Sequence, residues 1–283
     1  MTTDPAIETA APSAQNPVRA WLAVARFAAG QTVWNRRVLL TLLLFLVPVL
    51  TVVVVRAFGH DLERQQVATL YGWVTVIVAL AVIVPLTAML YFSSLVSQEA
   101  LEGTLVYLFT RRLNRPGVMA AKFVGAAVPL ALMALLAQGL LFLAAAAGEG
   151  GMRTASGVPE LWACAAVVAL AMVVFGALFA ALGVLVRRPL AAGIGYVFVC
   201  EWMLANRQLK IRQLSVNYYL RCILRAATER SPMAELFEDI LRGETTPARS
   251  SLATLAMVAA AALLVACLAV WRKEFTQARE EQT

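Results

Sequence analysis

The sequence predicts an all-α polytopic membrane protein with six transmembrane helices. Of its 283 residues, 61% are hydrophobic and 14% are charged, whereas soluble domains typically have about 25% charged residues. Six apolar runs reach or approach the ~20 residues needed to cross a hydrocarbon core of ~30 Å. These runs are roughly residues 38–56, 72–96, 118–147, 160–186, 189–206 and 251–271.

The chain before the first run falls into two parts. Residues 1–16 are polar and rich in Pro and Ala, without a basic stretch leading into an apolar one, so we expect a disordered tail and no signal peptide. Residues 17–37 combine an apolar helical face with four arginines. This pattern predicts a helix lying in the cytoplasmic headgroup region. A simple helical extension of the first span fits it equally well.

Three residues inside the apolar runs indicate how the expected helices pack against one another. Gly176 and Gly183 lie seven residues apart on one face of the fourth run, which favours close helix contact. Gln138 is a polar residue in the third run, where we expect a hydrogen bond to a neighbouring helix.

The charges of the short loops predict the orientation. Six spans put both termini on one side of the membrane. The short loops on that side carry basic pairs such as Arg111–Arg112 and Arg187–Arg188, and short basic loops face the cytoplasm. Both termini are therefore expected in the cytoplasm.

The longest polar interruption in the first half, Ser97–Phe123, contains a predicted amphipathic helix. Ser97 is a suitable N-cap, and Leu101, Leu105 and Leu108 share one face. Such a helix between two spans suits docking to a cytosolic partner. On physical grounds alone, a solvated hairpin loop with one helical turn fits about as well.

The same segment carries a family resemblance. Glu102-Gly103-Thr104-Leu105, Thr110-Arg111, Arg115 and Lys122-Phe123 resemble the signature of ABC-2 type permeases. They look like the branch that includes the nitrous-oxide-reductase maturation permease. Arg112, Asn114 and Ala121 depart from that pattern by replacing a proline, a serine and a glycine.

The resemblance implies a permease subunit of an ATP-driven exporter, with residues 17–283 as one ABC-2 type transmembrane domain. In that family the polar segment is the coupling helix that docks into a separate ATPase. The implied coupling residues are Glu99, Leu101, Glu102, Gly103, Thr104, Leu105, Arg111, Arg112 and Arg115.

The implied assembly is a homodimer of this chain with two copies of the ATPase, which would hold ATP and Mg, while this chain holds no cofactor. The implied location is the bacterial cytoplasmic (inner) membrane, in contact with lipids. A periplasmic or extracellular accessory protein is a further possible partner.

Residues 207–250 form the second polar region. Their pattern predicts two amphipathic helices lying at the outer face, the second starting with Ser231 as cap and Pro232 in its first turn. In the family, helices between spans five and six form a lid or gate, which makes Tyr218 and Tyr219 gate candidates. A folded external loop that serves only packing is the alternative.

Glu201 interrupts the fifth apolar run. An acid inside such a run faces a cavity or a partner, so Glu201 is a candidate for the translocation pathway or for pairing with Arg207. We expected a simpler placement, in which the fifth span is short and Glu201 reaches the outer headgroups. That placement predicts near-normal export for Glu201→Gln.

The sequence lacks the motifs that several other functions require. There is no G-x-x-x-x-G-K-[ST] for ATP, no H-E-x-x-H or G-x-S-x-G, and no C-x-x-C among four cysteines. No basic patch with interleaved aromatics indicates nucleic-acid binding. Two other classes stay open: a membrane-embedded lipid-modifying enzyme, and a non-transporting membrane anchor for a cytosolic protein.

Overall fold

The computed structural model describes residues 17–34, 36–58, 64–95, 115–147, 154–186, 188–204, 215–229 and 246–280, with residues 213, 231, 233, 234, 237 and 241. The regular elements within these residues are helices, and η marks a π-helical stretch. In chain order they are α1 (Pro17–Val33), α2 (Arg37–Phe58), α3 (Arg64–Trp73), η1 (Val74–Ile83), α4 (Val84–Phe92), α7 (Arg115–Ala146), α8 (Thr154–Leu185), α9 (Pro189–Tyr196), η2 (Val197–Leu204), α10 (Val216–Ala227) and α12 (Ala248–Glu280).

Five helices in the described part of the chain are long and apolar enough to cross a membrane. They are Arg37–Phe58, Gln66–Phe92, Pro116–Ala146, Gly157–Leu185 and Ala248–Trp271. This confirms a polytopic all-α membrane protein. The expected span at 189–206 corresponds to α9 and η2, two eight-residue pieces that together rise at most about 24 Å. A count of six spans therefore depends on this short helix.

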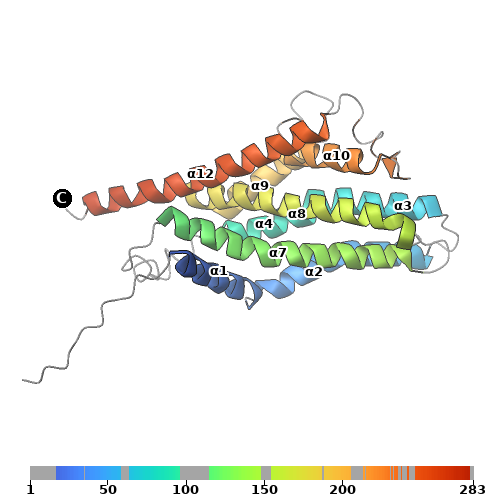
Figure 1. The fold of residues 1–283 in the computed structure, drawn as a ribbon, viewed down its shortest axis with the longest axis horizontal. Coiled ribbons are helices and arrows are strands. Elements are labelled where there is room, and N and C mark those ends of the chain that lie inside the picture. The colour runs from blue at the N-terminus through green and yellow to red at the C-terminus, as the bar shows by residue number, and fades with distance from the viewer. Residues whose placement is uncertain are drawn as a thin grey trace, which may run out of the picture.

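The long helices form one elongated bundle with two distinct ends (Figure 1). At the Arg37 end, the Arg37 guanidinium donates to the Leu90 carbonyl and the Ser94 hydroxyl, which joins the start of α2 to the last turn of α4. At the Arg56 end, the Arg56 guanidinium donates to the Ala145 carbonyl near the end of α7. We use these two names for the ends below.

Helix α8 is the centre of the bundle, since it packs against α4, α7, α10 and α12. Its glycines permit the close approach of α4. A Cβ at Gly176 would lie 2.7 Å from the Phe92 ring, and one at Gly183 would lie 2.5 Å from the Ser93 carbonyl oxygen. The predicted close packing at both glycines is confirmed.

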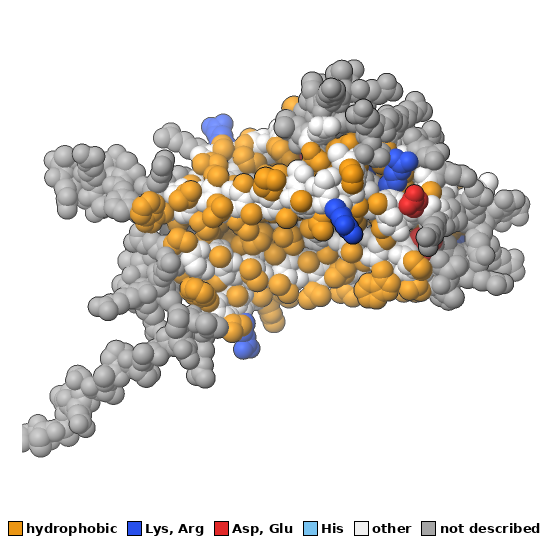
Figure 2. Space-filling model, turned by 45° about the horizontal axis from the view of Figure 1, so that its top comes forward, with side chains coloured by type: hydrophobic (Ala, Val, Ile, Leu, Met, Phe, Trp, Pro, Cys, Tyr) orange, Lys and Arg blue, Asp and Glu red, His pale blue; other side chains and the backbone are white. Residues whose placement is uncertain are grey.

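Helices α2 and α12 present apolar side chains outward. Leu43 on α2 and Leu264 on α12 are 67% and 63% exposed. Figure 2 shows hydrophobic side chains over most of the visible described surface, with few charged ones between them. A surface of this kind is stable against lipid rather than water.

Helix α1 is a separate element, because it ends at Val33 and α2 begins at Arg37. It packs along the start of α7, where Gly117 lies under the Trp21 ring and Gly125 fits against the Ala25 carbonyl. The alternative of an unbroken extension of the first span is therefore wrong. The headgroup location of α1 stays a prediction.

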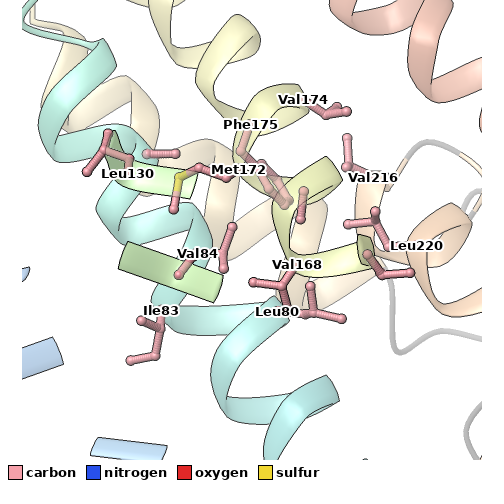
Figure 3. Close-up of a cluster of buried hydrophobic side chains, with 14 of the residues drawn as sticks. Leu80, Ile83, Val84, Leu130, Val168, Met172, Val174, Phe175, Val216 and Leu220 are labelled. Atoms are coloured by element: carbon pink, nitrogen blue, oxygen red, sulfur yellow. The ribbon is translucent and has the colours of Figure 1, made fainter. Parts of the chain in front are cut away.

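Helix α10 is amphipathic, as expected, and it packs against the bundle; its location at the outer face stays a prediction. Figure 3 shows Val216 and Leu220 in one apolar cluster with Val168 and Phe175, from the middle of α8. The first turn of α10 thus lies inside the bundle, and the helix also packs against α12. The physical reason is that the apolar face of α10 removes its side chains from water by packing against α8 and α12.

The expected second amphipathic helix falls mostly outside the described residues. Of its predicted apolar stripe, Phe237 and Leu241 are described, and both are buried. The Ser231 hydroxyl accepts a hydrogen bond from the Met233 amide at 3.3 Å.

Candidate functional site

The junction between η2 and α10 contains a buried carboxylate with four hydrogen bonds. Glu201 is 2% exposed. Its Oε1 accepts from the Tyr196 hydroxyl at 2.9 Å and the Val216 amide at 3.0 Å. Its Oε2 accepts from the Ser215 hydroxyl at 2.7 Å and the Asn217 amide at 3.0 Å.

Two of these bonds complete the start of α10. The first amides of a helix have no partner within it, and the helix dipole makes that end positive. Ser215 stands at the N-cap but makes no side-chain capping bond, because its hydroxyl donates to Glu201. The Glu201 carboxylate accepts from both first amides instead. It thereby joins two helices that are separated by residues 205–214 in the sequence.

The π-helical turn explains the Tyr196 bond. Tyr196 and Glu201 are five residues apart, a spacing that does not face one way on an α-helix. The i→i+5 pattern of a π-helix brings such residues together. The η2 stretch begins at Val197 and so brings the Tyr196 hydroxyl within hydrogen-bonding distance of Glu201.

These observations correct our placement of Glu201. Its carboxylate does not extend out of the protein as we expected, since it is enclosed by Tyr196 and the start of α10. The physical reason is that a charge in an apolar surrounding needs several donors, and an open helix end supplies them. Arg207, the partner that we had considered, lies outside the described residues.

A buried polar pair lies next to this carboxylate on α10. Asn217 and Arg221 are 1% and 5% exposed. The side-chain atoms Nδ2 and Oδ1 of Asn217, and Nε of Arg221, have no hydrogen-bond partner in the described structure. Burial lowers the pKa of the Arg221 guanidinium, and the nearby Glu201 carboxylate acts against this by raising that pKa.

The gate candidates Tyr218 and Tyr219 lie in the first half of α10. Their rings meet edge to face, with centroids 5.2 Å apart. Tyr218 is buried and Tyr219 is half-buried. The structure brings both onto the helix that Glu201 caps, within the same turn as Asn217.

A second polar site lies between the spans near the Arg56 end. The Gln138 side-chain amide donates to the Tyr71 hydroxyl at 2.7 Å and to the Thr75 hydroxyl at 3.0 Å. Gln138 is on α7, whereas its partners are on α3 and η1. The predicted helix-to-helix hydrogen bond is confirmed.

The predicted coupling residues cannot be placed in the same way. Residues 96–114 lie outside the described residues, and with them Glu99, Leu101, Glu102, Gly103, Thr104, Leu105, Arg111 and Arg112. Arg115 is the first residue of α7. The flanking helices are described: near the Arg37 end, Phe123 of α7 packs against Phe92 of α4 with ring centroids 5.2 Å apart.

Sequence reasoning missed Ser215, Asn217 and Arg221. A Ser followed by an apolar-periodic stretch is an N-cap signal, so the start of α10 at Ser215 could have been read from the sequence. Nothing in the sequence pairs that start with Glu201, because the link depends on the π-helical turn and on residues 14 to 16 positions apart.

No group of three or more His, Cys, Asp or Glu side chains that could hold a metal ion occurs among the described residues. The free cysteines Cys164 and Cys222 are buried, where a thiol behaves as a small apolar group. The hydrogen bonds of Glu201 hold η2 against the start of α10.

Comparison with known proteins identifies the family. The model of the ABC-2 family transporter proteins matches residues 35–201, which is more than half of the chain. The match runs from just before α2 through α9 and ends at Glu201. A search of curated proteins finds no match. With its apolar helical bundle and this match, the chain belongs to the ABC-2 family of transporter proteins.

Proposed function

We propose that this chain is the permease subunit of an ATP-driven exporter. Permeases of this family are generally non-catalytic membrane components and typically work with a separate ATPase subunit. The observation that carries the proposal is the family match over residues 35–201, which spans four of the five long apolar helices. Two copies of this chain and two ATPase subunits, with ATP and Mg on the latter, would form the complete exporter.

The proposed ATPase contact is the segment between α4 and α7. Both helices meet it near the Arg37 end, where Arg37 ties α2 to the last turn of α4. A push on this segment would therefore act on α2, α4 and α7 together. The residues that resemble the ABC-2 signature, Glu102 to Leu105, lie within it.

The proposed gate is α10, and Glu201 positions it. The α9–η2 helix begins at Pro189, close in the chain to the end of α8 near the Arg37 end, and finishes at Leu204, beyond Glu201. Because Glu201 binds the first amides of α10, a movement of α9 and η2 is passed to α10. Tyr218 and Tyr219 would move with that helix.

The proposal includes the orientation of the chain in the membrane and the branch of the family to which it is related. Basic short loops favour the Arg37 end on the cytoplasmic side of a bacterial cytoplasmic membrane, with both termini there and α10 in the outer half. The Glu102-Gly103-Thr104-Leu105 motif supports a relation to the nitrous-oxide-reductase maturation branch. An accessory protein outside the membrane fits this arrangement.

Coupling is tested by comparing Gly103→Trp with Glu102→Gln. A bulky side chain at Gly103 should obstruct close approach of the ATPase, whereas an exposed charge such as Glu102 contributes only ~1 kcal/mol or less. We expect Gly103→Trp to lose most permease-stimulated ATP hydrolysis and ATPase copurification, and Glu102→Gln to retain most of both. Expression in the membrane is measured as the control.

The outcomes separate the proposed function from its rivals. Normal copurification and stimulated hydrolysis with Gly103→Trp would move the contact to α1 or to the Arg187–Arg188 loop. Activity on lipids without any ATPase would favour a membrane-embedded enzyme. ATPase recruitment without transport would favour a membrane anchor.

The orientation has its own test. A single cysteine at Ser231, in a chain that lacks the native cysteines, should react with an impermeant maleimide from outside intact cells. A single cysteine at Thr283 serves as the control for the cytoplasmic side. Labelling of Ser231→Cys only after the membrane is permeabilised would reverse the orientation.

A further inference from the structure

The Asn217–Arg221 pair has hydrogen-bonding capacity that the described structure does not use. The two residues are four apart on α10 and therefore lie on one face of the helix. They are 1% and 5% exposed. The Asn217 side-chain atoms Nδ2 and Oδ1 and the Arg221 Nε nevertheless have no hydrogen-bond partner among the described residues. Burying polar groups in this way costs free energy, so these three atoms do not stabilise this conformation.

Glu201 does not supply a hydrogen-bond partner for these side-chain atoms. A carboxylate has about four acceptor positions, and the four bonds from Tyr196, Ser215 and the two amides of α10 occupy them. Glu201 thus acts on Arg221 as a nearby charge, without a hydrogen bond between them in the described structure.

The local charge balance favours an anion. The Glu201 charge is partly compensated by the start of α10, which carries about +0.5 of an elementary charge. Arg221 adds a full positive charge close by. Among the described charged groups, the Glu201 carboxylate raises the pKa of the Arg221 guanidinium. Glu201, Arg221 and the start of α10 taken together therefore retain a positive excess.

We propose that Asn217 and Arg221 form a binding subsite for an oxyanion group of the transported molecule. A guanidinium binds carboxylate and phosphate oxygens in pairs, and the Asn217 amide adds two donors one turn away. This inference rests on the proposed function, because it places the subsite on the gate helix. It assigns an anionic group, phosphate-like or carboxylate-like, to the substrate.

The proposal makes an unusual prediction about stability. Since a buried guanidinium whose Nε has no partner is destabilising, Arg221→Met should raise the melting temperature by about 2–4 °C, the shift that ~1 kcal/mol produces in a large single domain. Asn217→Leu should act in the same direction. A purely structural role predicts the opposite sign for both variants.

The experiment measures thermal unfolding of the full-length permease in a neutral detergent at constant ionic strength. The probes are inorganic phosphate, dihexanoyl phosphatidylglycerol and, as the neutral control, dihexanoylglycerol. We expect at least one anionic probe to raise the melting temperature of the wild type, and Arg221→Met to abolish that rise. Arg225→Met, one turn further along α10, removes the same charge and should retain it.

Each outcome decides the matter. A rise with inorganic phosphate indicates a free oxyanion, and a rise with the phospholipid alone indicates an anionic headgroup; both support the subsite. Three results would overturn the subsite. They are a lower melting temperature of both Arg221→Met and Asn217→Leu, an anion effect in Arg221→Met equal to that in the wild type, and no anion effect in the wild type. Because no ATPase is present, these results are independent of the coupling test at Gly103.

Discussion

Two buried polar sites in this bundle use different kinds of partner. Gln138 is neutral, and its amide donates to two hydroxyls on a neighbouring continuous helix. Glu201 is a carboxylic acid, and half of its four donors are backbone amides at the start of α10. The first site joins two spans along their sides, whereas the second joins two pieces of chain at a helix end.

The difference follows from what each group requires. A neutral amide is satisfied by one or two side-chain hydroxyls, which any neighbouring helix can supply. A buried carboxylate requires several donors, and the backbone offers free ones only at a helix start. A charged residue inside an apolar run therefore indicates a nearby break in the helices. In this molecule the break is also where α10, the proposed gate, begins.

The largest effect is expected for Glu201→Leu. It leaves the Val216 and Asn217 amides buried without acceptors, and each such group costs roughly 1–3 kcal/mol, so we expect a loss of about 3 kcal/mol in the free energy of unfolding together with most transport. Glu201→Gln keeps one acceptor oxygen and should lose about half as much. This replaces our earlier expectation of near-normal export for that variant.

The control for this prediction is Glu229→Gln, which changes an exposed acid just after α10. Thermal unfolding and transport of the reconstituted complex are measured for all three variants. Wild-type values for Glu201→Leu in both assays would show that the carboxylate neither holds nor positions α10.

A smaller effect is expected for single donors to Glu201. A hydrogen bond to a charged group contributes about 1.5–3 kcal/mol, so Ser215→Ala and Tyr196→Phe should each lie near the lower value. Combined with Glu201→Leu, either change should cost little more, because its acceptor is already gone. Additive losses in unfolding free energy would contradict a shared site.

The smallest effect is expected at the neutral site. Hydrogen bonds between membrane helices contribute about 0.6 kcal/mol on average, and at most about 1.7. We therefore expect Gln138→Leu to lower the free energy of unfolding by about 1 kcal/mol without a specific loss of transport. Thr75→Val, which removes one of the two acceptors, should cost less. A loss at Gln138 equal to that at Glu201 would remove the distinction between the two sites.

Part of the candidate site could be predicted from the sequence. Gln138 was assigned a helix-to-helix bond, and Gly176 and Gly183 were assigned close packing, because a polar or a very small residue in a span has few possible roles. Glu201 was recognised as unusual for the same reason. Its side chain was expected to extend out of the protein but is buried, because its donors lie at the start of α10, which the sequence does not pair with η2.

The sequence alone determined the class of the molecule: a long apolar chain with few charges must satisfy its backbone internally, and helices in a bilayer do so. It also contains, in residues 102–123, the residues that resemble the ABC-2 signature. Only the tertiary structure decided that α1 is a separate helix along α7, that α10 enters the bundle, and that Asn217 and Arg221 are buried beside Glu201. The physical reason is that periodicity reports which face of a helix is apolar, while the partner of that face, and the donors for a buried charge, come from residues distant in the chain.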